Sequence, residues 1–252
     1  MPSKPTLVFV PGGFHLPSCF ELVENRLKSA GYECIGVRTP SVRKEPPFPK
    51  DMSDDVQAVQ AALNKAIGDE NDAVLVMHSY GGFPGSAACK GMSKEDRVKE
   101  GKKGGVVHLV FISAFAAEEG MKIADAGGKI SDEVLPSDWC IVEPGGYMRA
   151  ERSNEIFYND LPEEEANKAS SKLQYHASAA FSAIQTYSAF KFIPSTYIIC
   201  ELDNAIPPAL QEVMAKQPEA DMIIERLKSS HSPFYSMPEE TSLIIRKAAG
   251  EF

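Results

Sequence analysis

A serine, an acidic residue and a histidine each follow a short apolar segment of this 252-residue chain. Ser79 lies in the run VLVMHSYGG, Asp203 comes shortly after the apolar segment 195–200, and His231 follows the segment 222–227. A serine hydroxyl becomes a nucleophile at neutral pH when an imidazole takes its proton, and a carboxylate holds that imidazole in the required tautomer. These three residue types therefore point to nucleophilic catalysis at a carbonyl carbon.

Alternating strands and helices are expected to carry these residues. Apolar runs bounded by turn residues predict strands, and these cover residues 6–10, 33–38, 73–77, 106–113, 195–200 and 222–227. Apolar residues at helical spacing predict helices, and these cover residues 19–30, 53–67, 81–91 and 207–216, with a last helix from Pro238. Strands that are apolar at every position are typical of a parallel sheet covered by helices on both faces. The predicted fold class is therefore α/β.

The carboxyl ends of parallel strands meet at one edge of a sheet, where ligands bind in α/β folds. Ser79, Asp203 and His231 all follow predicted strands, so we expect them at that edge. Glu201 is a competing acid, but Asp203 lies further into the loop, where a carboxylate can turn towards the histidine. Two plainer alternatives remain: Ser79 as a polar turn that ends a strand, and His231 as a surface-loop residue.

Backbone N–H groups near Ser79 are suited to stabilise an oxyanion. The N–H of Tyr80 follows the nucleophile at the start of a helix, and the PGGF loop after the first strand supplies a second donor, from Gly13 or Phe14. Met77 is the one departure from the G-x-S-x-G pattern of a nucleophile elbow. Small residues normally flank the serine, so this position is the weakest part of the match.

The alternation of strands and helices breaks between residues 116 and 190, where glycine, proline and acidic residues are mixed with aromatic ones. No strand is evident there, so the segment is predicted to be a helical cap, or lid, inserted over the sheet. Residues 1–115 and 191–252 then form the core domain. Segment 93–105, which is charged and flanked by glycine, is predicted to be a solvated loop. The aromatic cap favours a hydrophobic substrate.

Composition narrows the class of protein. The chain is 43% hydrophobic and 24% charged, as expected for a globular protein, and its net charge of −9 argues against binding to nucleic acid or an anionic membrane. Its five cysteines are never spaced CxxC, which disfavours a disulfide framework or a metal site. No run approaches the roughly 18 apolar residues of a membrane span. We expect a cytoplasmic protein without metal or cofactor, and the sequence is compatible with a homodimer.

The chain reads FVPGGFHLPSCF after the first strand, VMHSYGG around Ser79, and YIICELDNAIP and LKSSHSPFYSMPEE around Asp203 and His231. These stretches resemble the first loop, the nucleophile elbow, and the acid and histidine loops of the α/β-hydrolase superfamily, and within it of the group of plant methylesterases and hydroxynitrile lyases with their fungal and bacterial relatives. The resemblance covers nearly the whole chain and implies the α/β-hydrolase fold. It implies a catalytic triad of Ser79, Asp203 and His231. It also implies that Gly13 and Tyr80 are the oxyanion donors.

Two positions depart from the lyases of this group. Those lyases use a threonine in the first loop and a lysine directly after the catalytic histidine, whereas this chain has Gly12 and Ser232. Both departures argue against cyanohydrin cleavage. The expected function is a serine hydrolase that cleaves a carboxylic ester or lactone of a small-to-medium hydrophobic substrate through an acyl-enzyme intermediate.

Gly12, Phe14, Phe115 and Trp139 are the predicted substrate contacts. Two alternatives to hydrolysis stay open. One is a biosynthetic enzyme that uses the same triad for acyl transfer, lactone formation or lyase chemistry. The other is a hydrolase-like receptor that binds its small-molecule ligand with little turnover. Comparing the products formed with and without a competing alcohol distinguishes the biosynthetic enzyme from a hydrolase. Ligand binding that is unchanged by Ser79→Ala identifies the receptor.

Overall fold

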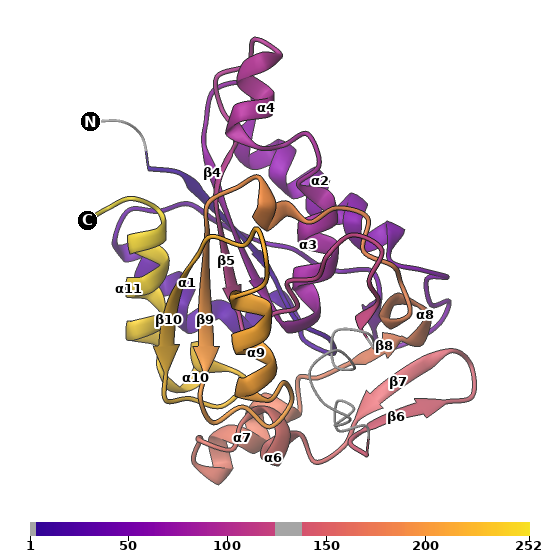
Figure 1. Cartoon of the computed structure of the whole chain (residues 1–252). Helices are drawn as coiled ribbons and strands as arrows, with labels where there is room; N and C mark the ends of the chain where they lie inside the picture. Colours follow the sequence, from indigo (N-terminus) through magenta and orange to yellow (C-terminus); the bar gives the residue numbers. More distant parts are fainter. Residues whose placement is uncertain (1–3, 124–137) are drawn as a thin grey trace.

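A six-stranded parallel sheet runs through the middle of the molecule in the order β10-β9-β5-β4-β1-β2 (Figure 1). This computed structural model describes residues 4–123 and 138–252. The strands are β1 (Thr6–Val10), β2 (Cys34–Gly36), β4 (Ala73–His78), β5 (Val106–Ile112), β9 (Ser195–Cys200) and β10 (Met222–Leu227). All six were predicted, and the α/β fold class is confirmed.

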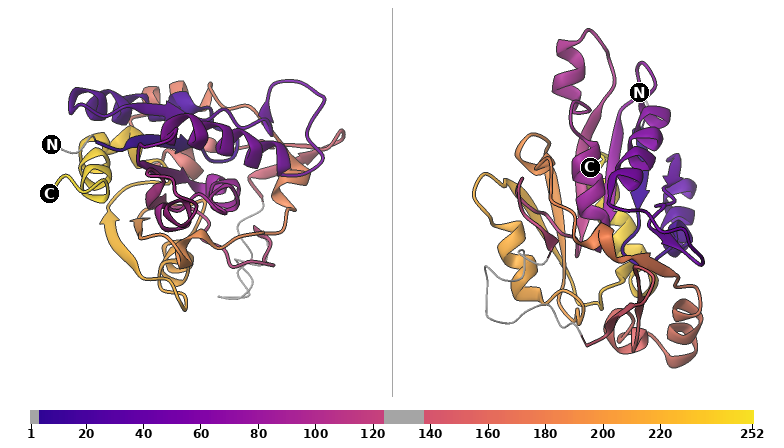
Figure 2. Two further views of the ribbon diagram at one scale, coloured as in Figure 1. Left: turned by 90° about the horizontal axis from the view of Figure 1, so that it is seen from above. Right: turned by 90° about the vertical axis from the view of Figure 1, so that its right-hand side faces the viewer.

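Helices cover both faces of this sheet (Figure 2). One face carries α1 (Glu21–Ser29) and α11 (Pro238–Ala248), preceded in the chain by the short helices η1 (Pro17–Phe20) and α10 (Pro233–Ser236). The other face carries α2 (Ser53–Ile67), α3 (Gly82–Ala88) and α9 (Pro208–Ala215). Successive side chains of a strand point to opposite faces, so Val74 and Val76 pack on the first layer, whereas Leu75 and Met77 pack on the second. Both layers bury apolar side chains, which explains the unbroken apolar runs.

A second, antiparallel sheet lies beside the carboxyl edge of the first, in the order β3-β8-β7-β6 (Figure 1). Its strands are β3 (Val42–Arg43), β6 (Cys140–Glu143), β7 (Tyr147–Ala150) and β8 (Tyr175–Ala177). The helices near it are α6 (Ser153–Phe157), α7 (Glu163–Ser170) and α8 (Ser178–Phe181), and η3 (Ala189–Lys191) leads back to β9. The expectation that segment 116–190 holds no strand is therefore wrong. Its strands are three or four residues long, too short for a clear period-two pattern.

A helix also occupies part of the segment predicted to be a loop, residues 93–105. Helix α4 (Lys94–Lys99) begins after Ser93, whose Oγ accepts a hydrogen bond from Asp96 N at 3.0 Å. The Arg97 side chain donates to the carbonyl oxygens of Gly104 and Gly68 at 2.7 and 2.8 Å. An N-cap serine was thus present in the sequence, but the short, charged helix lacks the apolar stripe that would have identified it.

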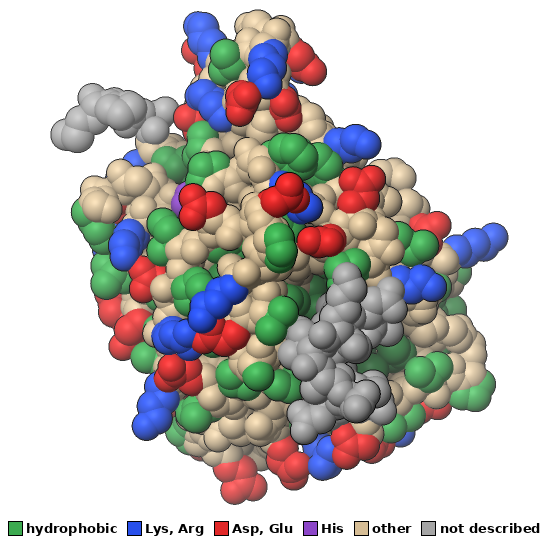
Figure 3. Space-filling view, in the orientation of Figure 1, with side chains coloured by type: hydrophobic (Ala, Val, Ile, Leu, Met, Phe, Trp, Pro, Cys, Tyr) green, Lys and Arg blue, Asp and Glu red, His purple; other side chains and the backbone are tan. Residues whose placement is uncertain are grey.

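Acidic and basic side chains are interspersed over the face shown in Figure 3, with apolar side chains between them. In the two described ranges, none of the helices is long and apolar enough to span a bilayer.

Candidate active site

Ser79 occupies a strained turn at the carboxyl end of β4. Its φ of +51° lies in the left-handed region that non-glycine residues rarely adopt. The turn continues as η2 (Ser79–Gly81) and leads directly into α3. A Cβ on Gly81 would lie 2.6 Å from the carbonyl oxygen of Val10, and one on Gly82 would lie 2.3 Å from that of Phe115. Only glycine fits at these two positions, and the strand–turn–helix geometry is that of a nucleophile elbow.

The elbow forms although Met77 stands where the motif usually has glycine. The Met77 side chain is fully buried against α3. A Cβ on Gly85 would lie only 2.4 Å from Met77 Sδ. The space that the motif usually gains from its first glycine is therefore supplied here by a glycine one turn into the helix.

Asp203 and His231 form a buried pair in the loops that follow β9 and β10. His231 Nδ1 lies 2.7 Å from Asp203 Oδ2, and the two residues are 1% and 5% exposed. Asp203 Oδ1 accepts hydrogen bonds from the backbone N–H groups of Ala205 and Ile206 at 2.7 and 2.9 Å. The competing acid, Glu201, is exposed. With Nδ1 occupied by the carboxylate, Nε2 is the ring nitrogen of His231 that is left to act as a base.

Two further side chains, which the sequence analysis missed, contact Asp203. Ser113 Oγ donates to Asp203 Oδ2 and also lies 3.2 Å from His231 Nδ1. Gln211 Nε2, on α9, donates to the same carboxylate oxygen at 3.0 Å. Ser113 has a φ of +40° and ends a predicted strand at the predicted edge, so its position was a usable signal. Nothing in the sequence around Gln211 indicated its role.

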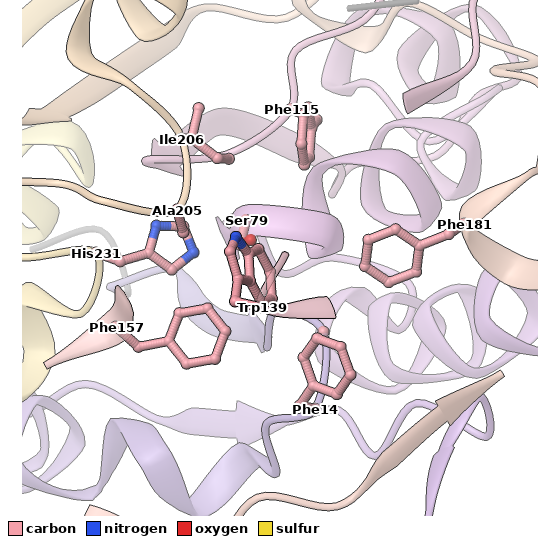
Figure 4. Close-up of a pocket in the computed structure, with 10 residues that line it drawn as sticks. Phe14, Ser79, Phe115, Trp139, Phe157, Phe181, Ala205, Ile206 and His231 are labelled. Carbon is pink, nitrogen blue, oxygen red and sulfur yellow. The ribbon is translucent and has the colours of Figure 1, made fainter. Parts of the chain in front are cut away.

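Ser79 and His231 line one cavity of about 50 Å³, and aromatic side chains form most of its wall (Figure 4). Of the predicted substrate contacts, Phe14, Phe115 and Trp139 line it, together with the predicted oxyanion donor Gly13. The sequence analysis missed the rest of the wall, which consists of Phe157, Phe181, Ala205 and Ile206. The cavity is thus apolar except at the serine and the histidine, which matches an uncharged substrate.

Gly12, also predicted as a substrate contact, does not line this cavity. A Cβ on Gly12 would lie 2.7 Å from His78 Nδ1 and 2.8 Å from Ser79 Cβ. Gly12 therefore lets the first loop pack directly against the elbow. Gly13, and not Gly12 as predicted, is the glycine of this loop that lines the cavity.

Two buried histidines, His15 and His78, contact backbone carbonyl groups of the site. His15 Nδ1 lies 2.7 Å from the carbonyl oxygen of Gly13, and the Tyr158 hydroxyl lies 2.9 Å from His15 Nε2. Burial lowers the pKa of His15 to about 4, so its ring is neutral at pH 7. His78 Nε2 lies 3.0 Å from the carbonyl oxygen of His231, and burial lowers the pKa of His78 well below its usual value. Both rings therefore fix backbone groups of the site without adding charge.

The two predicted oxyanion donors, Gly13 and Tyr80, both lie next to Ser79. Gly13 lines the cavity together with Ser79, and Tyr80 is the residue directly after Ser79. The Tyr80 side chain turns away from the cavity and donates to Asp55 Oδ2 at 2.6 Å. Tyr80 is thus available to the site through its backbone. In the described ranges, no cluster of side chains is arranged to hold a metal ion.

The fold is that of an α/β hydrolase. The profile described as "Alpha/beta hydrolase family" matches residues 7–242, and the chain belongs to that family. It is 34% identical over 250 residues to an α/β hydrolase of Aspergillus novofumigatus, covering 98% of each chain. It is 26% identical over 270 residues to methylesterase 18 of Arabidopsis thaliana, again covering 98% of each. Its structure resembles that of a pyrethroid hydrolase from Sphingobium faniae, with a TM-score of 0.75, 23% identity and coverage of 98% and 99%.

Proposed function

We propose that the protein is a serine hydrolase that cleaves a carboxylic ester or lactone of a small-to-medium hydrophobic substrate. The observation that carries this proposal is the strained Ser79 in one apolar cavity with His231, whose other ring nitrogen lies 2.7 Å from Asp203. A methylesterase among the relatives supports ester chemistry.

The mechanism follows from these positions. Ser79 Oγ attacks the substrate carbonyl carbon while His231 Nε2 takes its proton. Asp203, held by five donors, keeps His231 in the tautomer that leaves Nε2 free and stabilises the imidazolium. His231 then returns the proton to the leaving alcohol. Water, activated by the same histidine, hydrolyses the acyl-enzyme and regenerates Ser79.

The backbone N–H groups of Gly13 and Tyr80 are the proposed donors to the tetrahedral oxyanion. Donors held in place before the reaction stabilise the charge that develops in the transition state, and losing one typically lowers kcat by about 10²- to 10³-fold. The position after His231 is Ser232, so no lysine ammonium stands there to stabilise a leaving cyanide. This supports hydrolysis over cyanohydrin cleavage.

The test is turnover of short-chain p-nitrophenyl esters and an aryl lactone, together with labelling by a fluorophosphonate. Short acyl chains are the first choice because the cavity is small. We expect Ser79→Ala to abolish labelling and to lower kcat by roughly 10⁴-fold or more. Ser86→Ala is the matched control, since Ser86 is fully buried in α3 but does not line the cavity.

Labelling and turnover that persist in Ser79→Ala contradict the proposed nucleophile. Product analysis with an added alcohol separates hydrolysis from acyl transfer, because a transferase would give the new ester in place of the free acid.

A further inference from the structure

A buried carboxylate, Asp55, lies beneath the elbow, outside the cavity. Asp55 belongs to the first turn of α2 and is 0% exposed. Its Oδ1 accepts the backbone N–H of Ser41 at 2.8 Å, and its Oδ2 accepts the hydroxyls of Ser41 and Tyr80. Burying a carboxylate is costly unless donors surround it. Because Asp55 is buried at that cost next to the proposed active site, we expect it to have a specific role there.

Its partners connect it to two other parts of the molecule. Tyr80 directly follows Ser79, and its ring is fully buried. The Tyr80 ring packs edge-on against His176 at 4.5 Å and stacks on Phe181 at 5.2 Å between centroids. The Ser41 carbonyl oxygen accepts the backbone N–H of Ala177 at 2.9 Å, in β8 of the second sheet. One carboxylate thus connects α2, the elbow and the second sheet.

These contacts fix the Tyr80 side chain at both ends. The hydroxyl is held by Asp55, and the ring packs against both His176 and Phe181. A fixed ring selects one side-chain rotamer, and the rotamer restricts the φ and ψ angles of the same residue. The direction of the Tyr80 backbone N–H is therefore coupled to the Asp55 hydrogen bond.

We propose that Asp55 is a positioning residue for the reaction: through the Tyr80 hydroxyl it keeps the Tyr80 backbone N–H directed at the substrate oxyanion. This inference rests on the proposed hydrolase function. Asp55 does not line the cavity, so it acts on the transition state through Tyr80 and not on substrate binding.

The experiment compares Tyr80→Phe, Asp55→Asn and the double variant in the full chain. Each is assayed for kcat and KM with a p-nitrophenyl ester and for inhibition by an aryl trifluoromethyl ketone, which forms a tetrahedral oxyanion adduct with the serine. We expect Tyr80→Phe to lower kcat roughly 10-fold, a part of the effect of losing a whole donor. KM should change less than about 2-fold, and inhibitor affinity should fall with kcat.

Non-additivity tests the route of the effect. If Asp55 acts through the Tyr80 hydroxyl, Asp55→Asn should lower kcat much less in the Tyr80→Phe background than in the native chain. The matched control is Tyr32→Phe. Tyr32 is also a buried tyrosine whose hydroxyl donates to a carboxylate, that of Glu251 at 3.0 Å. Its loss should lower the unfolding temperature and leave kcat and inhibitor affinity unchanged.

A folded Tyr80→Phe variant with native kcat and native inhibitor affinity overturns the positioning role, as does a rise in KM alone. Thermal unfolding of each variant shows whether it is folded, and Tyr80→Phe decides the question by itself if Asp55→Asn does not fold. Absence of turnover and labelling in the native protein contradicts the proposed function itself, and the positioning role with it.

Discussion

At the scale of single residues, Asp203 shows how the fold holds a charge next to an apolar cavity. Two backbone N–H groups, the Ser113 hydroxyl, the Gln211 amide and His231 all reach its two oxygens. Charge-assisted hydrogen bonds of this kind are stronger than neutral ones. The position of the carboxylate is thereby fixed before any substrate arrives.

Replacing Asp203 by asparagine tests this arrangement. The amide keeps the shape, but it can donate to His231 Nδ1 and so favours the tautomer in which Nε2 carries the proton. We expect kcat to fall by roughly 10⁴-fold. Glu201→Gln is the matched control, because Glu201 is exposed two residues away, and its kcat should stay within about 2-fold. An equal fall in kcat in the two variants would contradict the assignment of Asp203 as the orienting acid.

At the scale of elements, the elbow depends on one contact between β4 and α3, in which a large side chain on the strand packs against a glycine on the helix. Met77 is large where the motif is usually small, and Gly85 leaves room for it. The strand and the helix therefore specify each other at this contact. A change on one side alone should strain the turn that holds Ser79.

Gly85→Ala should therefore destabilise the protein, although alanine favours helix formation by about 1 kcal/mol over glycine. The added methyl would meet Met77 Sδ, and overpacking of this kind lowers the free energy of unfolding by about 1–3 kcal/mol. Combining it with Met77→Ala should recover part of this loss. Urea unfolding of both single variants and the double variant measures the coupling, and strictly additive effects would contradict the proposed contact.

The elements that sequence could predict are those whose signal is local. Strands β1 and β9 are buried at every residue, and their apolar runs gave their exact bounds. Strands β6, β7 and β8 are short and mostly half-buried, and their sheet is completed by β3 from far earlier in the chain. Such pairing is a property of the tertiary fold that no window of sequence contains.

The same distinction applies to the site. Ser79, Asp203 and His231 were predicted as site candidates because each follows a strand, and in a parallel sheet that position fixes the edge. The contact of Gln211 with Asp203 depends instead on how α9 packs on β9. The cavity wall was only partly predicted, because the sequence of segment 116–190 does not show whether an aromatic side chain faces the cavity or the core.

At the scale of the whole molecule, buried histidines link stability to pH. His176 is 0% exposed, and in the described ranges neither of its ring nitrogens has a hydrogen-bond partner. Burial lowers its pKa to about 3, from 6.5 when unfolded. Below pH 6.5 the unfolded chain binds a proton that the folded chain does not, so the stabilisation present above pH 6.5 is lost as the pH falls.

His176→Leu should therefore make the protein less sensitive to acid. Between pH 7.5 and pH 5, His176 alone should account for a loss of about 2 kcal/mol in the free energy of unfolding. Urea unfolding of the native protein and the variant at both pH values measures the difference. If the free energy of unfolding falls equally in both proteins, the His176 ring is protonated inside the fold. The variant's stability at pH 7.5 is the internal reference.

The strand order also has a consequence for how the chain is made. Strands β1, β4 and β5 come from the first 112 residues, whereas β9 joins β5 only after residues 113–194 have been synthesised. Pairing over such a separation requires a long loop to close and is slow. Ser79 therefore leaves the ribosome long before Asp203 and His231. A nascent chain therefore carries the proposed nucleophile without the proposed base, and on the mechanism proposed above we expect no turnover until the C-terminal strands have joined the sheet.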